Sequence, residues 1–91
     1  MTPEAYEKKA IKDYLKTKDI FYYHNLAGLG VFPGIPDITA IAKNGKVYQI
    51  EVKAPGGTQS NNQKKFQAQW EARGGIYILG GIDEVLSKIK N

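Results

Sequence analysis

Two acidic residues and a lysine interrupt what otherwise reads as a β-hairpin, in the stretch GIPDITAIAKNGKVYQIEVKAPGG at residues 34–57. Asp37 opens the first predicted strand, and Glu51 and Lys53 close the second. A charge that is buried without a partner destabilises a protein, so strands of this composition need something that compensates the charges. The first question is therefore what this hairpin holds.

The turn at residues 43–45 decides which side chains share a face of the hairpin. A three-residue loop pairs Ala42 with Lys46 and sets Asp37 opposite Glu51, and Gly45 supplies the left-handed residue that such a loop needs. One face is then apolar, with Ile38, Ala40, Ala42, Tyr48, Ile50 and Val52, and the other gathers Asp37, Thr39, Gln49, Glu51 and Lys53. A two-residue loop leaves no apolar face, so the pattern favours the three-residue loop.

In this register two carboxylates face each other, with Cβ atoms about 5 Å apart. Their repulsion is best relieved by Mg²⁺ or Mn²⁺, which prefer carboxylate oxygens and keep several waters. Lys53 lies on the same face, where a lysine can orient a metal-bound water as the ammonium or deprotonate it as the neutral amine. A salt-bridge network of Asp37, Glu51 and Lys53 at the end of a sheet is the alternative, and the geometry alone leaves both open.

The elements that must position this hairpin follow from caps and periodicity. Residues 3–17 read as a helix with Thr2 as N-cap, and its inward stripe carries Glu4, Glu7, Ile11, Tyr14 and Leu15. Residues 20–24 form a short aromatic strand, and a glycine-rich connection follows at 25–34. The hairpin strands span roughly 36–42 and 46–53.

The second half of the chain predicts a helix, a strand and a closing helix. Ser60 and Gln63 have capping-box spacing at the start of a helix over 60–75, on which we expect Phe66 and Trp70 to lie in the core. A buried strand over 76–79 and an amphipathic helix over 82–90 follow. The order α-β-β-β-α-β-α predicts an α/β fold in which helices flank one central mixed sheet.

The length and composition of the chain limit the classes of protein to which it can belong. Ninety-one residues with 42% hydrophobic side chains predict a single domain over residues 1–91. The absence of cysteine excludes disulfides and thiolate sites, and no stretch has the length of a signal peptide's apolar region or of a membrane span. We therefore expect an intracellular, cytoplasmic protein, in the host cytoplasm if it is viral. The net charge of +4 suits a polyanionic partner, although a solvated helix face explains the lysine clusters equally well.

Pro36-Asp37 followed by Glu51-Val52-Lys53 resembles the motif of the PD-(D/E)XK nuclease superfamily, which has a restriction-endonuclease-like fold. The flanking GIPD, IEVKAPGG and SNNQKKF, with a later GG, are similar to the VRR-NUC family of virus-type replication-repair nucleases. This similarity covers nearly the whole chain. The extended pattern is specific, whereas an isolated D…ExK occurs often by chance.

The resemblance implies roles for individual residues. Asp37 and Glu51 match the metal-binding acids, the Val52 backbone carbonyl matches a further metal ligand, and Lys53 matches the catalytic lysine. The family also carries a glutamate on the first helix, for which we choose Glu7 and keep Glu4 as the alternative. Gln63 matches a glutamine near such sites, although its capping-box position explains it without catalysis.

The resemblance also implies an activity. We expect a Mg²⁺-dependent endonuclease, with Mn²⁺ as a substitute, that hydrolyses DNA phosphodiester bonds in DNA repair. Stand-alone members of this size imply a homodimer that acts on branched DNA such as four-way junctions. A catalytically silent DNA-binding module with the nuclease fold, or a simple nicking nuclease, is the alternative.

Overall fold

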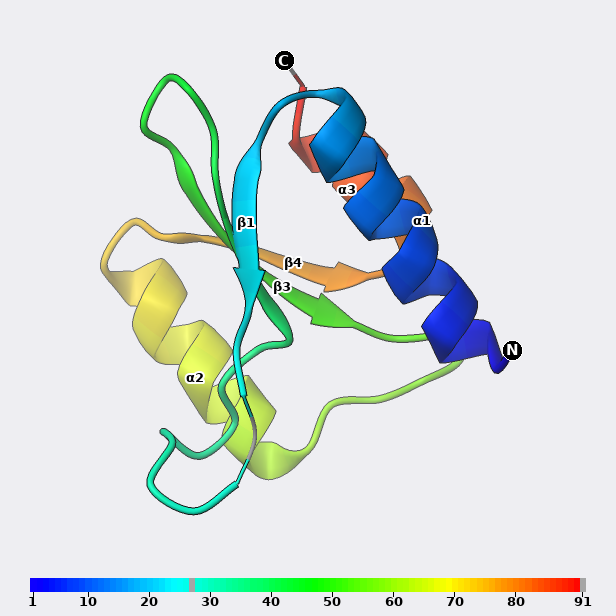
Figure 1. Ribbon diagram of the computed structural model, residues 1–91. Helices are drawn as coiled ribbons and strands as arrows, with labels where there is room; N and C mark the ends of the chain where they lie inside the picture. Colours follow the sequence, from blue (N-terminus) through cyan, green and yellow to red (C-terminus); the bar gives the residue numbers. More distant parts are fainter. Residues whose placement is uncertain (27, 91) are drawn as a thin grey trace.

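The helices and strands follow one another in the predicted order in the computed structural model, which describes residues 1–26 and 28–90 (Figure 1). They are α1 (Pro3–Thr17), β1 (Phe21–His24), β2 (Ile38–Ile41), β3 (Val47–Val52), α2 (Asn61–Ala72), β4 (Ile76–Gly80) and α3 (Ile82–Lys88). The predicted order α-β-β-β-α-β-α is therefore confirmed, and the observed hairpin strands are shorter than the predicted ones at both ends.

The four strands form one mixed sheet in the order β1-β2-β3-β4, in which only the β3–β4 pair is parallel. Ile38 faces Ile50 and Ile41 faces Val47 across the hairpin. The Ala42 N–H donates to the Lys46 carbonyl at 3.0 Å, and Gly45 closes the turn with a φ of 88°. These pairings confirm the three-residue loop that the apolar pattern predicts.

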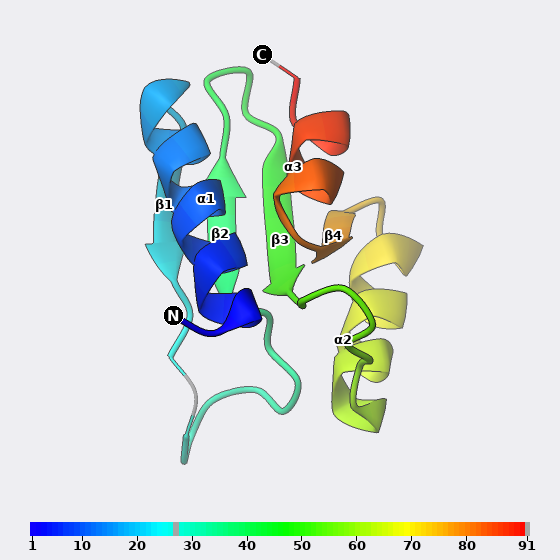
Figure 2. The same cartoon turned by 90° about the vertical axis from the view of Figure 1, so that its right-hand side faces the viewer.

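Two layers of helices enclose the sheet unequally. Helices α1 and α3 lie side by side on one face, and α2 lies on the other face (Figures 1 and 2). The main core lies under α1 and α3 and consists of Ile11, Leu15, Ile20, Ile38, Ala40, Ala42, Tyr48, Ile50, Val52, Ile78, Val85 and Ile89. The apolar face predicted for the hairpin is thus the buried one.

Helix caps form as their sequence signals predict. Thr2 accepts a hydrogen bond from the Ala5 N–H at 3.1 Å, and Ser60 and Gln63 complete a reciprocal capping box. The inward stripe of α1 is only partly as predicted, because Ile11 is buried whereas Glu4 is exposed. The first turn of α1 lies at the end of the sheet, where no strand remains to cover it (Figure 1).

Helix α2 departs from the prediction that its aromatic residues lie in the core. Phe66 and Trp70 are only half-buried, and no residue described within α2 is fully buried. The helix contacts β4, so the same face of the sheet over β1 stays open, with Phe21 and Tyr23 exposed. No helix in the described ranges 1–26 and 28–90 is long and apolar enough to cross a membrane.

Candidate metal centre

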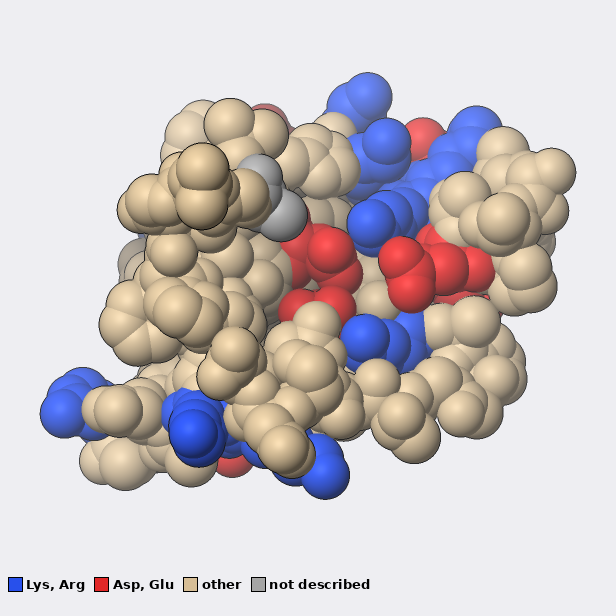
Figure 3. Space-filling model, turned by 90° about the horizontal axis from the view of Figure 1, so that it is seen from below, with Lys and Arg blue, Asp and Glu red and all other residues tan. Residues whose placement is uncertain are grey.

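The candidate site lies where β2 begins and β3 ends. Asp37 directly precedes β2, Glu51 is the penultimate residue of β3, and Lys53 directly follows β3. The first turns of α1 bring Glu4 and Lys8 to the same end of the sheet. Figure 3 views the molecule from this end and shows Asp and Glu residues near the centre of the face, with Lys and Arg residues beside them.

Asp37 is held by contacts to both of its carboxylate oxygens. Its Oδ2 accepts a hydrogen bond from the Val52 N–H at 2.7 Å, and its Oδ1 lies 3.4 Å from the ammonium nitrogen of Lys8. The Asn25 N–H donates to the Asp37 carbonyl at 2.8 Å and fixes the backbone before β2. The Asp37 carboxylate is therefore fixed in place from the neighbouring strand.

Glu51 is a buried acid, with 4% of its surface exposed. Burial raises its pKa to about 8, and the charge of Asp37 and a hydrogen bond with Asp37 act in the same direction. Lys53 lies 3.8 Å away and lowers the pKa of Glu51, but it does not offset these effects. Without a metal, the protonated form of Glu51 is therefore favoured beside Asp37.

The backbone carbonyl of Val52 accepts no backbone hydrogen bond from the residue opposite it in the hairpin, because that residue is a proline. The bond between Ala42 and Lys46 makes the even-numbered residues of this hairpin the hydrogen-bonded pairs, so the Val52 carbonyl is directed toward residue 36, while the Val52 N–H donates to the Asp37 carboxylate. Pro36 has no N–H to donate. The carbonyl keeps its lone pairs available beside Asp37.

These groups fit a divalent cation. Two carboxylates and a backbone carbonyl are hard oxygen ligands, and Mg²⁺ is commonly held by one or two carboxylates with waters completing its shell. A bound cation would favour the ionised form of Glu51, which burial and Asp37 disfavour. Within the described part of the chain, no three Asp, Glu or His side chains gather closely enough to hold a metal by themselves, so a carbonyl or water ligands would be needed.

The two helix-one glutamates have different surroundings. Glu7 accepts a hydrogen bond from the Ile82 N–H at 2.8 Å, at the first residue of α3, where the helix dipole favours an acid. Glu4 lies 3.6 Å from Lys8 and is close enough to Glu51 to raise its pKa further. Glu4 therefore lies within electrostatic reach of Glu51, whereas the Glu7 carboxylate is bonded to the start of α3.

Gln63 sits in the first turn of α2 and is half-buried. Its side-chain oxygen accepts a hydrogen bond from the Ser60 N–H at 2.8 Å, while the Ser60 hydroxyl oxygen accepts one from the Gln63 N–H at 3.2 Å. The capping role is thus confirmed. This capping bond uses one of the two lone pairs of the Gln63 side-chain oxygen.

A polar network behind the acids was not identified from the sequence. Thr39 and Gln49 face each other across the hairpin and are both buried, and their side chains bond to each other and to Asn25. The Asn25 amide also donates to the Pro36 carbonyl at 3.0 Å. This network ties β1 to the residues before β2. The signal for it was the pair of uncharged polar residues opposite each other on the acid-bearing face.

Lys53 also lines a cavity of about 330 Å³ on the α3 side of the centre. Two glycine pairs form much of its wall, Gly56–Gly57 and Gly80–Gly81, together with Glu7, Asp83 and Glu84. The Lys53 side chain keeps 20% of its surface exposed, so its ammonium group is accessible beside Glu51. The lysine thus lies between the acid pair and open solvent.

Comparison with known proteins supports the fold. No family model matches the chain, and no curated protein matches it in sequence. A solved structure described as a VRR_NUC domain superposes with a TM-score of 0.85 and 20% sequence identity, over 99% of this chain and 100% of that chain. The chain has the fold of a VRR_NUC domain, which is the restriction-endonuclease-like fold that the PD and EVK residues predicted.

Proposed function

We propose that this protein is a metal-dependent endonuclease of the VRR-NUC family that hydrolyses DNA phosphodiester bonds. The observation that carries the proposal is the pair of acids at the end of the hairpin, in which buried Glu51 lies opposite Asp37. Such a pair, next to a lysine at the open end of a sheet, suits chemistry at a phosphate better than it suits stability. The shared fold with a VRR_NUC domain supports the same activity.

Asp37, Glu51 and the Val52 carbonyl are the groups that would hold Mg²⁺ or Mn²⁺. When bound, such a cation supplies Lewis-acid polarisation of the phosphate and an acidified water. The hydrogen bond from the Val52 N–H orients Asp37 for this task, and Pro36 leaves the Val52 carbonyl unpaired in the ladder.

The remaining residues would position water and stabilise negative charge on the phosphate. Lys53, 3.8 Å from Glu51, would position the attacking water and steady the negative charge that develops on the phosphate. Lys8, beside Asp37, would contact a phosphate oxygen. Glu4 is our choice for the helix-one acid that orients water at the centre, with Glu7 as the alternative.

DNA is the substrate that the charge distribution favours. The net charge is +4, and lysines follow one another along the first helix and the second, at Lys8, Lys9, Lys12, Lys16, Lys18, Lys64 and Lys65. Contacts of this kind hold a phosphate backbone without reading its sequence. From the resemblance of the sequence motifs to VRR-NUC nucleases, we propose branched DNA as the substrate, a homodimer as the working unit, and a role in DNA repair.

Cleavage assays on supercoiled plasmid and on nicked, flapped, forked and four-way DNA test this function. We expect cleavage in Mg²⁺ and in Mn²⁺, none in EDTA, and the greatest rate on a branched substrate. The variant Glu51→Gln controls for a contaminating nuclease. DNA binding without cleavage in either metal would overturn the proposal in favour of a silent DNA-binding module.

A further inference from the structure

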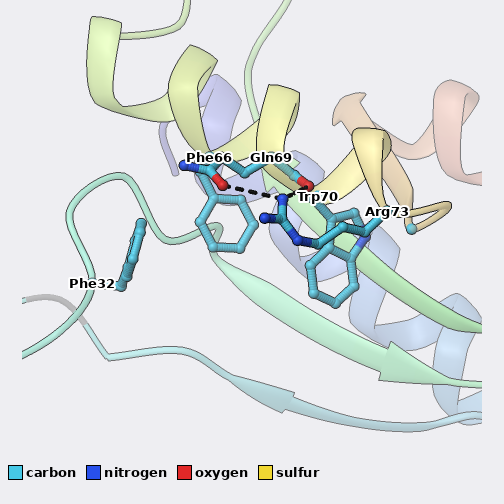
Figure 4. A pocket seen from close by; sticks show the side chains of 6 residues that line it. Phe32, Phe66, Gln69, Trp70 and Arg73 are labelled. Carbon is cyan, nitrogen blue, oxygen red and sulfur yellow. Dashed lines mark hydrogen bonds between the residues drawn. The ribbon is translucent and has the colours of Figure 1, made fainter.

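An aromatic groove opens on the α2 side of the sheet, outside the candidate metal centre. It has a volume of about 460 Å³, within the range of small-molecule sites. Phe32 of the glycine-rich connection forms one side, and residues of α2 and the turn after it form the other, namely Phe66, Gln69, Trp70, Arg73 and Gly75 (Figure 4). None of these lining residues, all in the described part of the chain, is acidic.

The α2 wall of the groove is rigid. Trp70 donates its indole N–H to the Ile76 carbonyl at 2.9 Å, and its ring packs so closely on Gly75 that a side chain there would collide with it. Phe66 lies nearly parallel to Trp70, with ring centroids 6.0 Å apart and an interplanar angle of 16°. The two rings therefore form a fixed aromatic surface.

The opposite side is held in place but exposed. The ring of Phe32 stands edge-on to Phe66 at 5.9 Å and keeps 59% of its surface exposed. Gly34 anchors this segment to α2, because its φ of 79° and its contact with the Asn62 backbone leave no room for a side chain. The Phe32 ring is therefore not part of the hydrophobic core and can contact a ligand in the groove.

The polar groups at the groove are those that recognise a nucleotide. Arg73 is fixed by hydrogen bonds to the Gln69 carbonyl at 3.0 Å and to the Gln69 side-chain oxygen at 3.1 Å (Figure 4). An exposed guanidinium offers charge to a phosphate or a planar surface to a base, and the Gln69 amide nitrogen offers a donor to a base edge. Aromatic rings accept any base by stacking.

The groove also lies close to the acid pair. Tyr77 packs against Phe66 with ring centroids 6.4 Å apart, and it pairs with Gln49 across the β3–β4 ladder. Glu51 stands two residues beyond Gln49 on the same face of the sheet, so it is a diagonal neighbour of Tyr77. One side chain therefore separates the groove from Glu51, and a nucleotide near a phosphate at the centre could reach it.

We propose that this groove, with the Phe66–Trp70 surface as its floor and Phe32 at its edge, binds an unpaired nucleobase of single-stranded DNA. Its rims carry Arg73 and no acid, which complements a polyanion. A base held there requires a strand that is locally unpaired, as at the branch of a fork or flap. The inference rests on the proposed function, since it takes DNA as the partner.

Trp70 is the only tryptophan in the chain, so its fluorescence reports directly on the groove. The test titrates the full chain in EDTA, where cleavage does not occur, with a single-stranded oligonucleotide, and follows both Trp70 emission and the anisotropy of the labelled DNA. We expect quenching by this DNA, little quenching by the same sequence as a duplex, and none by an oligonucleotide whose central positions are abasic.

Three variants make the test specific. Phe32→Ala should weaken single-strand binding about five- to hundredfold, and Phe32→Leu should weaken it similarly because it keeps apolar volume but loses the ring. Leu29→Ala is the matched control, since Leu29 lies in the same connection, is fully exposed and does not line the groove. Circular dichroism checks that each variant is folded.

Binding of the oligonucleotide with unchanged Trp70 emission would overturn the inference, as would a Phe32→Leu variant that binds as the wild type does. Emission that shifts with protein concentration in the absence of DNA would assign the groove to a second copy of the chain instead. Cleavage of plasmid in Mg²⁺ without this fluorescence response would support the proposed function and contradict base binding in the groove. The fluorescence response without cleavage would support base binding in the groove and contradict only the proposed function.

Discussion

The Val52 N–H donates to Asp37 Oδ2 at 2.7 Å across the end of the hairpin, so the backbone of one strand fixes the carboxylate of the other. The same residue directs its carbonyl toward Pro36, which cannot bond to it. The N–H and the C=O of Val52, which belong to two successive peptide groups, are thereby both directed to the side of β3 on which Asp37 lies. A proline before the acid therefore leaves the Val52 carbonyl without a backbone donor.

The metal-free protein should lose stability as pH rises from about 4.5 to about 8. The Glu51 carboxyl has a pKa of about 8 in the folded protein against an ordinary value of 4.5, so between these values the folded state holds a proton that the unfolded state has released. The free energy of unfolding then falls with rising pH across this window. The stabilisation that the Glu51 proton contributes is fully present only below the window. Thermal melts in EDTA from pH 4 to 9 measure the effect.

The variant Glu51→Gln isolates this contribution, because every other titrating group is common to both proteins. Its melting temperature in EDTA should fall less with pH, and near pH 8 it should equal or exceed that of the wild type. Mg²⁺ or Mn²⁺ at pH 8 should raise the melting temperature of the wild type only. Equal pH slopes in the two proteins would mean that Glu51 is ionised throughout, and a clear drop in metal-free stability at pH 8 would favour the salt-bridge network.

Two substitutions should separate metal binding from turnover. Glu51→Gln removes a metal ligand, so we expect neither Mn²⁺ binding by calorimetry nor cleavage. Lys53→Ala should keep Mn²⁺ affinity and lose about 10²–10³-fold in the cleavage rate, since the ammonium acts on water and developing charge. A Lys53→Ala protein with much weaker Mn²⁺ binding would show that the lysine organises the ligands instead.

Much of this site could be predicted from the sequence because a β-hairpin has a period of two. Once the apolar pattern selected a three-residue loop, the register placed Asp37 opposite Glu51, and the observed pairing of Ile38 with Ile50 agrees with it. Capping residues fixed the helix starts in the same local way, as the bonds of Thr2 and Ser60 show. Local rules were sufficient for these features.

Contacts between distant segments could not be predicted in this way. The periodicity of α1 put Glu4 and Glu7 on one stripe, but only the position of Ile82 in space shows that Glu7 bonds to the start of α3. The same holds for α2, where Phe66 and Trp70 have core spacing yet cover only part of the sheet. Helical spacing defines a face, and tertiary packing decides how much of that face is covered.

A matched pair of substitutions should resolve the helix-one acid. Glu7→Ala leaves the Ile82 N–H without its acceptor, which costs about 1–3 kcal/mol and should lower the melting temperature by several degrees. Glu4→Ala removes an exposed side chain and should cost less than about 1 kcal/mol. Cleavage, measured well below both melting temperatures, should fall markedly for Glu4→Ala and little for Glu7→Ala. The opposite order of activities would restore Glu7 as the acid of the centre.

The surface of the proposed homodimer should include the exposed face of β1. Residues 20–36 contain no Asp, Glu, Lys or Arg, and Phe21 and Tyr23 on the edge strand β1 are 64% and 47% exposed. Helix α3 is a poorer candidate, since Val85 packs in the core of its own chain. Aromatic residues with few charges are typical of the centre of a protein–protein interface.

Two cuts in a four-way junction need two active sites at a fixed separation, and a two-fold dimer supplies them through one self-complementary surface. Light scattering at micromolar concentration should therefore give twice the chain mass of 10.1 kDa. Phe21→Ser with Tyr23→Ser should give a monomer that nicks plasmid but no longer makes paired cuts in a junction. Tyr6→Ser, which changes an aromatic residue of similar exposure on α1, is the control and should remain dimeric. A wild-type monomer that still nicks DNA would contradict the dimer and leave a simple nicking nuclease.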